Sequence, residues 1–206
     1  MKYETVVVGA LETNCYLVYC EDSLESIVID PGADPHKIFA AVAEIGIKPL
    51  MLVNTHGHID HVGANMDIKE HYDIPLYIHE SDALMLQNGL QSEIAFLLNA
   101  HPSPEPDGYL VEAQELKIGN SQLTVISTPG HSPGGISLRG EGCLFSGDTL
   151  FYGGVGRTDL PGGSWDVLVD SIRSRIFVLP DDTVVLPGHG PATTIGQEKE
   201  INPYVK

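Results

Sequence analysis

The stretch NTHGHIDHVG, residues 54–63, places three histidines and one aspartate within six positions, namely His56, His58, Asp60 and His61. The run before it, PLMLVNT at residues 49–55, is typical of a buried strand, so the cluster lies in the loop that leaves that strand. In an extended segment, side chains two residues apart point the same way. Such a loop can bind a metal, orient a proton-transfer group or form a polar turn, and it cannot close a catalytic metal site alone.

Three later segments carry similar residues beside glycine: TPGHSPG with His131, FSGDTL with Asp148, and LPGHG with His189. Glycine allows close backbone approach and positive φ, which suits a ligand held on a tight turn. Imidazole nitrogen and carboxylate oxygen bind zinc, iron and manganese. Seven ligands of these types are too many for one tetrahedral ion and suit two ions that share a carboxylate.

The order of apolar runs predicts an α/β fold with two sheets. Strand patterns cover residues 3–8, 14–20, 25–32, 49–55, 75–79, 109–118, 121–128, 134–140, 142–148 and 183–188. Helices are expected from an Asp34 N-cap to Gly46 and over residues 64–72, 81–87, 92–100 and 165–177. This alternation is typical of two sheets with helices on their outer faces. Because loops at strand ends converge on one edge of such a fold, the polar segments are expected to meet there.

Composition limits the classes of partner. The chain has 206 residues, 11 Lys and Arg, and a formal net charge of −17, which disfavours nucleic acid because phosphates are repelled. We find no secretory signal and no apolar run of membrane-spanning length, so a cytoplasmic protein is expected. Cys15, Cys20 and Cys143 match no zinc or redox spacing and are expected to be buried free thiols.

The motifs together resemble the metallo-β-lactamase superfamily, with VIDPG and its Asp30 as the first of five. The resemblance covers nearly the whole chain and implies a four-layer αβ/βα sandwich. It also implies that Asp148 bridges two divalent ions and that Asp30 braces the ligand loop from behind. The implied ligands are His56, His58 and His131 for one ion and Asp60, His61 and His189 for the other.

Two further segments, FYGGVGRTDLPGGS (151–164) and VVLPGHGPATTIGQEKEINPYV (184–205), resemble short hydroxyacylglutathione hydrolases of the glyoxalase II type. This implies attack of a metal-activated hydroxide, oriented by Asp60, on a thioester such as S-lactoylglutathione. We expect residues 1–206 to form a single domain without a C-terminal helical glutathione-binding domain. Arg157 corresponds to a glutathione-contacting lysine of that family, and Asp159 stands where the family has tyrosine. Arg157 therefore either binds substrate or pairs with Asp159.

Other interpretations stay open. Persulfide dioxygenases have a similar GRTD segment and tail, and bind one iron through residues corresponding to His56, His131 and Asp148. A non-catalytic metal-binding module is the third class. Asp148, where the best-known β-lactamases have cysteine, favours a dinuclear hydrolase. Zinc is the favoured metal, with iron or manganese as alternatives. The acyl group and the oligomeric state are left open by the sequence.

Overall fold

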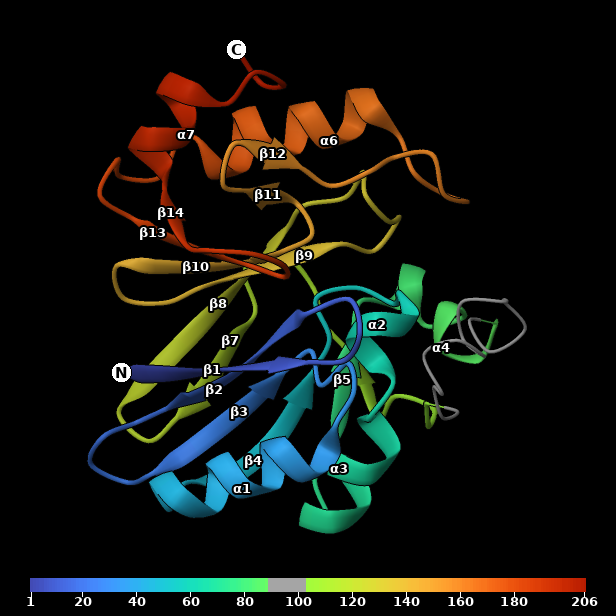
Figure 1. Cartoon of the computed structure of the whole chain (residues 1–206), viewed down its shortest axis with the longest axis vertical. Coiled ribbons are helices and arrows are strands. Elements are labelled where there is room, and N and C mark those ends of the chain that lie inside the picture. Colours follow the sequence, from blue (N-terminus) through green and yellow to red (C-terminus); the bar gives the residue numbers. More distant parts are fainter. Residues whose placement is uncertain (89–102) are drawn as a thin grey trace.

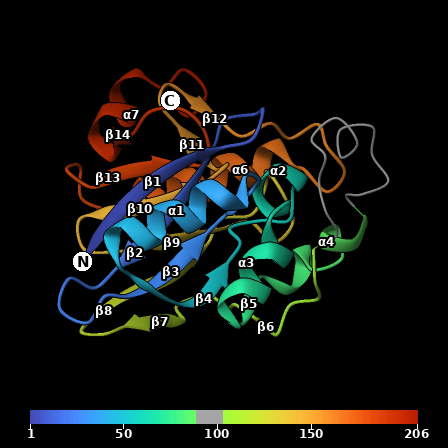
Figure 2. The ribbon, with the colours of Figure 1, turned by 60° about the horizontal axis from the view of Figure 1, so that its bottom comes forward.

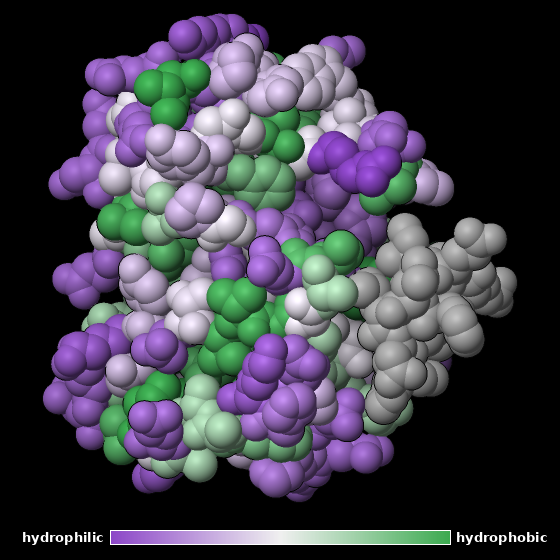
Figure 3. Space-filling view, viewed as in Figure 1, coloured by the Kyte–Doolittle hydropathy of each residue, from purple (hydrophilic) through white to green (hydrophobic). Residues whose placement is uncertain are grey.

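Two six-stranded β-sheets stack face to face at the centre of the molecule, with helices on both outer sides (Figure 1). The computed structural model describes residues 1–88 and 103–206, so the helix expected at residues 92–100 lies outside the described ranges. Within them, no helix is both long and apolar enough to cross a membrane. The face drawn in Figure 3 is largely hydrophilic, with smaller apolar areas between.

The first sheet has its strands in sequence order, antiparallel among the first three and parallel from the third onward. Its strands are β1 (Lys2–Val8), β2 (Thr13–Tyr19), β3 (Glu25–Ile29), β4 (Lys48–Val53), β5 (Leu76–Ile78) and β6 (Gly108–Tyr109). Three pairings of this sheet are parallel and need crossover connections. The helices of the first two connections are α1 (Pro35–Ile45) between β3 and β4, and α2 (Ile59–Val62) with α3 (Asn65–Tyr72) between β4 and β5. Figure 2 shows α1 and α3 across this sheet.

The second sheet has the order β14-β13-β10-β9-β8-β7, with only β10 and β13 parallel. Its strands are β7 (Glu115–Ile118), β8 (Ser121–Ser127), β9 (Ile136–Arg139), β10 (Cys143–Gly147), β13 (Val184–Pro187) and β14 (Thr193–Thr194). Helix α6 (Trp165–Ser171) continues as a π-helix, Ile172–Ile176, and α7 is Ile195–Ile201. A hairpin of β11 (Leu150–Phe151) and β12 (Gly154–Val155) precedes α6. The remaining elements are the 3₁₀ turn η1 (Glu80–Asp82) and α4 (Met85–Asn88).

Three buried apolar clusters separate four layers. Alternate residues of a strand face opposite sides of its sheet. Accordingly, Val28 joins the cluster under α1 and α3, whereas Ile27 and Ile29 join the cluster between the two sheets. A third cluster packs Leu144 and other residues of the second sheet against α6 and α7. The predicted four-layer αβ/βα sandwich is therefore confirmed.

Several local expectations are wrong. Residues 109–118 do not form one strand, because the chain leaves the first sheet after Tyr109, turns through Ala113 at φ 63°, and enters the second sheet at Glu115. Residues 81–87 form the η1 turn and short α4 instead of one helix. The helix ends at Gly46 as predicted, with the Gly46 N–H donating to the Val42 carbonyl. All three cysteines are free and buried, as expected.

Asp34 is the N-cap residue of α1, as predicted, but its side chain does not cap the helix. Its backbone is left-handed, φ 50°, which turns the carboxylate toward the preceding loop. There Oδ2 accepts a hydrogen bond from the Gly9 N–H at 3.0 Å and pairs with Lys37 Nζ at 2.7 Å.

Candidate metal centre

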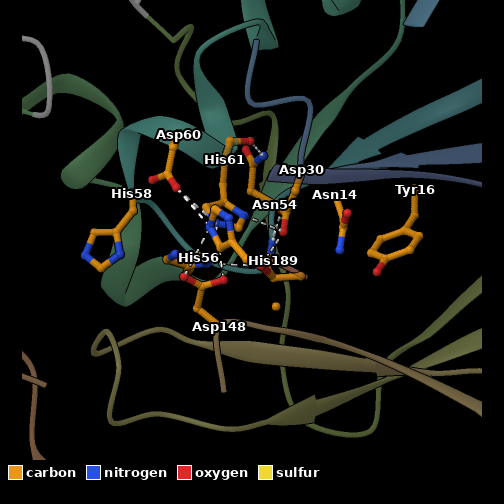
Figure 4. Close-up of polar contacts among 12 residues, drawn as sticks. Asn14, Tyr16, Asp30, Asn54, His56, His58, Asp60, His61, Asp148 and His189 are labelled. Carbon is orange, nitrogen blue, oxygen red and sulfur yellow. Dashed lines mark hydrogen bonds and ion pairs between the residues drawn. The ribbon is translucent and has the colours of Figure 1, made fainter. Parts of the chain in front are cut away.

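The seven predicted ligands gather at one edge of the two sheets. Figure 4 shows all of them except His131, which contacts His58. Each comes from a segment that begins within a few residues of a strand end. The loop of residues 54–63 follows β4, His131 lies between β8 and β9, Asp148 directly follows β10, and His189 follows β13. The expectation that the polar segments meet at an edge is therefore confirmed as geometry.

One cluster consists of His56, His58 and His131, whose candidate ligand nitrogens all lie within 4.8 Å of one another. His58 Nδ1 is 2.8 Å from His131 Nε2. His56 Nε2 is buried and has no hydrogen-bond partner among the described residues. A buried polar nitrogen without a partner is costly, so the donor atoms of this cluster fit a cation.

A second cluster consists of Asp60, His61 and His189, again with ligand atoms within 4.8 Å. Asp60 Oδ2 lies 3.1 Å from His189 Nε2 and 3.6 Å from His61 Nε2. The two imidazole Nε2 atoms are 3.2 Å apart. The cluster is less enclosed than the first, because His189 keeps 26% of its side chain exposed.

Asp148 lies between the clusters. Its Oδ2 is 3.5 Å from His131 Nε2 in the first cluster and 3.7 Å from His189 Nε2 in the second. Its Oδ1 is 3.3 Å from His61 Nε2, is buried, and makes no hydrogen bond to the described residues. The Asp148 carboxylate thus lies close to imidazole nitrogens of both clusters.

Hydrogen bonds on the far side of the imidazoles set their orientation. Nδ1 of His61, His131 and His189 lies 3.0, 2.7 and 2.9 Å from Asp30 Oδ2, the Arg157 carbonyl and the Leu11 carbonyl, respectively. A carboxylate or carbonyl oxygen accepts a hydrogen bond from Nδ1–H, which in the neutral ring assigns the lone pair to the Nε2 atom that faces the cluster. The outer contacts thus present each ring in the tautomer suited to binding a cation.

Asp30 supports the ligand loop as well as one ring. Its backbone is left-handed at φ 51°, and the side chain is almost fully buried. Oδ1 accepts from the Thr55 N–H at 2.7 Å and Oδ2 from the Thr55 hydroxyl at 2.6 Å. That hydroxyl is also 3.1 Å from His56 Nδ1. One carboxylate therefore fixes the start of the loop together with the His61 ring.

The electrostatics leave the imidazoles of His56 and His58 neutral and the carboxylates of Asp60 and Asp148 charged. Burial, reinforced by neighbouring histidines, lowers the pKa of His56 well below its usual value and that of His58 to about 4. Burial opposes ionisation of Asp148, yet His61 and the other imidazoles hold its pKa below the usual value. Neutral imidazoles and ionised carboxylates are the protonation states that divalent cations require.

Arg157 contributes to the site through its backbone. Its carbonyl orients His131, and its exposed side chain makes a bidentate pair with Asp159, with Nε–Oδ1 and Nη2–Oδ2 both 2.7 Å. The predicted ion pair is thus present, and substrate binding by Arg157 stays a prediction. Outside the motifs, His36 and His71 are exposed and His79 is half-buried. His101 lies outside the described residues.

Three supporting residues were missed by the sequence analysis: Asn14, Tyr16 and Asp82. Asn14 Nδ2 donates to the Pro187 and Gly190 carbonyls at 2.9 Å each, and the Tyr16 hydroxyl donates to the Pro187 carbonyl at 2.7 Å. These bonds hold the turn that carries His189 (Figure 4). The only signal in the sequence was a polar residue inside the apolar run NCYLVYC.

Comparison with known proteins agrees with this geometry. A model of the metallo-beta-lactamase superfamily matches residues 8–189. The probable metallo-hydrolase YqgX of Bacillus subtilis is 38% identical over 208 residues, covering 100% of this chain and 98% of the relative. The hydroxyacylglutathione hydrolase GloC of Haemophilus influenzae is 35% identical over 209 residues, with 100% and 98% covered.

Two solved structures are similar over nearly their whole length. The BLEG-1 B3 metallo-beta-lactamase has a TM-score of 0.91 and 36% identity, covering 99% of each chain. TTHA1623, solved in a di-iron-bound form, has a TM-score of 0.90 and 38% identity, covering 98% of this chain and 99% of its own.

Proposed function

The chain belongs to the metallo-beta-lactamase superfamily, and we propose that it is a dinuclear metallo-hydrolase that cleaves thioesters of the hydroxyacylglutathione type. The observation that carries the proposal is the pair of three-residue clusters with the Asp148 carboxylate between them. The buried, unpartnered atoms His56 Nε2 and Asp148 Oδ1 support occupation by cations.

In this proposal His56, His58 and His131 hold one ion. Asp60, His61 and His189 hold the second, and Asp148 is shared. Zinc is the favoured metal, and the di-iron-bound relative keeps iron as an alternative. When bound, two such ions supply a Lewis acid for the substrate carbonyl and lower the pKa of a water molecule toward neutrality.

Asp60 is proposed to orient the attacking water. Burial opposes its ionisation, yet His61 and His189 hold the pKa of Asp60 below its usual range, so the carboxylate stays charged at neutral pH. Its side chain keeps 16% exposure, so it is open to the solvent side. An ionised carboxylate accepts a hydrogen bond from water and so fixes the direction of attack.

A thioester fits a site without a dedicated acid. A thiol with an ordinary pKa of about 8.5 leaves as thiolate with little help from a proton donor. In the described part of the chain, the side chains at the two clusters are imidazoles and carboxylates used in mutual contacts. The full-length similarity to GloC supports this substrate class. The similarity to BLEG-1 makes a β-lactam amide the second candidate.

The test measures three reactions of the metal-loaded chain and, on the same samples, the number of metal ions per chain. We expect cleavage of S-lactoylglutathione, little hydrolysis of a chromogenic cephalosporin, and no oxygen uptake with glutathione persulfide. Asp60→Asn should abolish cleavage, whereas His36→Gln, at an exposed histidine outside the clusters, should leave it unchanged. Faster cephalosporin hydrolysis, or oxygen uptake with one iron per chain and no thioester cleavage, would overturn the proposed substrate.

A further inference from the structure

Asp82 is a fully buried carboxylate outside the seven proposed ligands. It closes the η1 turn after β5 and accepts three hydrogen bonds. Oδ2 accepts from the Gly57 N–H at 3.1 Å and from the Ser132 hydroxyl at 2.6 Å, and Oδ1 accepts from the Gly134 N–H at 2.6 Å. A buried carboxylate with this many donors is an anchoring group, because each charge-assisted bond is stronger than a neutral one.

The three donors flank the ligands of the first cluster. Gly57 lies between His56 and His58, and Ser132 directly follows His131. The histidine loop leaves β4 of the first sheet, whereas His131 lies between β8 and β9 of the second. One side chain from a third segment therefore joins the two loops whose relative position defines this cluster.

The backbone of both loops packs closely against Asp82. A Cβ added at Gly57 would be 2.9 Å from the Asp82 carbonyl, and one added at Gly134 would be 2.8 Å from Asp82 Oδ1. Glycine is thus required on both sides of the carboxylate. The second cluster is supported by other groups, namely Asp30 and the Leu11 carbonyl.

We propose that Asp82 is a positioning residue that sets the distance between the two loops of the first cluster, and so controls the affinity of that cluster alone for its ion. The inference rests on the proposed dinuclear site. Loss of a group that orients metal ligands typically lowers metal affinity by about ten- to a hundredfold. The effect is confined to one ion because, within the described part of the chain, Asp82 has no hydrogen bond or ion pair with Asp60, His61 or His189.

Variants of graded severity follow from the contacts. Asp82→Ala leaves all three donors without their acceptor. Asp82→Asn removes one acceptor in either orientation, because its amide nitrogen must face either the Gly134 N–H or the Gly57 N–H. Ser132→Ala removes one donor and keeps the carboxylate with both backbone bonds, so it is the mildest change.

Glu198→Gln is the matched control. Glu198 is also fully buried and accepts from the Gly153 N–H, the Thr193 hydroxyl and Asn202 Nδ2 at 2.6 to 2.9 Å. It ties α7 to the β11–β12 hairpin instead of to the ligand loops. It should lower stability comparably and leave metal binding unchanged.

The experiment titrates the metal-free chain with Co²⁺, following the absorption bands of the bound ion and the number of ions per chain. We expect two ions in the wild type and a ten- to hundredfold weaker binding of one of them in Asp82→Ala. Asp82→Asn should lower the affinity for this ion less than Asp82→Ala does, and Ser132→Ala should lower it least. In a His189→Ala chain, which keeps the first cluster intact, adding Asp82→Ala should lower the affinity for the ion that still binds tightly. In a His131→Ala chain, which lacks the complete first cluster, adding Asp82→Ala should not lower the metal affinity further.

The outcomes separate this inference from the proposed function. A wild-type chain that binds no Co²⁺ would overturn the dinuclear site and the inference with it. Two ions in the wild type, with unchanged affinities in Asp82→Ala or equal weakening of both, would overturn the role of Asp82 alone. So would an equal loss of one ion in Glu198→Gln, because the effect would then follow general destabilisation.

Discussion

The bonds from β2 to the turn that carries His189 give a quantitative prediction. Asn14 donates to two carbonyls and Tyr16 to one, and both donate to the Pro187 carbonyl. Burial raises the pKa of Tyr16, so its hydroxyl keeps the proton it donates. A neutral hydrogen bond contributes about 0.5–1.5 kcal/mol net to stability.

From these contacts, Tyr16→Phe should lower the free energy of unfolding by about 1 kcal/mol, because Pro187 keeps its bond from Asn14. Asn14→Ala loses two bonds and should cost about 2 kcal/mol. In the double variant the Pro187 carbonyl loses both side-chain donors at once. The combined loss should therefore exceed the sum of the single losses, by about 1 kcal/mol.

Urea unfolding of the metal-free chain, followed by circular dichroism, measures these differences. Tyr19→Phe is the control. Tyr19 lies on the same strand, and its hydroxyl makes no hydrogen bond to the described residues, so the free energy of unfolding should change by less than about 0.5 kcal/mol. Additivity of the two losses within about 0.3 kcal/mol would refute the shared-acceptor reasoning. A Tyr16→Phe chain as stable as the wild type would refute the contribution of this bond.

Three other predictions concern the site and its surroundings. Asp60→Ala should lower the rate of thioester cleavage by roughly 10²–10⁴-fold, measured as kcat with metal-loaded chain, and a rate within twofold of the wild type would refute the role of Asp60 in orienting the attacking water. Gly188→Ala should abolish binding of at least one ion, because its Cβ would lie 2.2 Å from Oδ1 of the shared carboxylate. Gly154→Ala, whose Cβ would lie at an ordinary 3.7 Å from Phe151 Cβ, should keep both ions in a metal count. Asp34→Asn should remove a part of the free energy of unfolding that depends on pH. The bonds from Lys37 and from the Gly9 N–H lower the pKa of Asp34 in the folded chain. The ionised carboxylate therefore stabilises the fold fully above the unfolded-state pKa of about 3.9, and this stabilisation is lost as pH falls through the folded-state pKa. The stability gap between wild type and Asp34→Asn should then narrow below about pH 4 in denaturant melts, and a gap independent of pH would contradict this.

The fold class followed from local pattern. Alternating and continuous apolar runs assign strands, and the order of strands and helices restricts how they can be layered. The errors arose where local signals compete. Residues 109–118 are apolar enough for one strand, yet the left-handed backbone at Ala113 moves the chain from one sheet to the other. The Asp34 carboxylate bonds the Gly9 N–H, 25 residues away, and the Lys37 side chain instead of capping a backbone N–H of its own helix.

The sequence by itself determined which side chains could bind cations, because imidazoles and carboxylates beside glycine, each just after a strand, are local features. The structure places all seven together, and their role as ligands stays a prediction. The single-domain organisation of residues 1–206 also stays a prediction.

Only the tertiary structure decided what holds that group in place. Asn14 and Tyr16 reach carbonyls 171 to 176 positions away in the sequence, and Asp82 reaches Ser132 across 50. Such contacts depend on how two sheets stack and on which turn closes against which strand. Helical and strand periodicities report only which face of an element is buried, so a buried polar residue shows no partner until the layers are assembled.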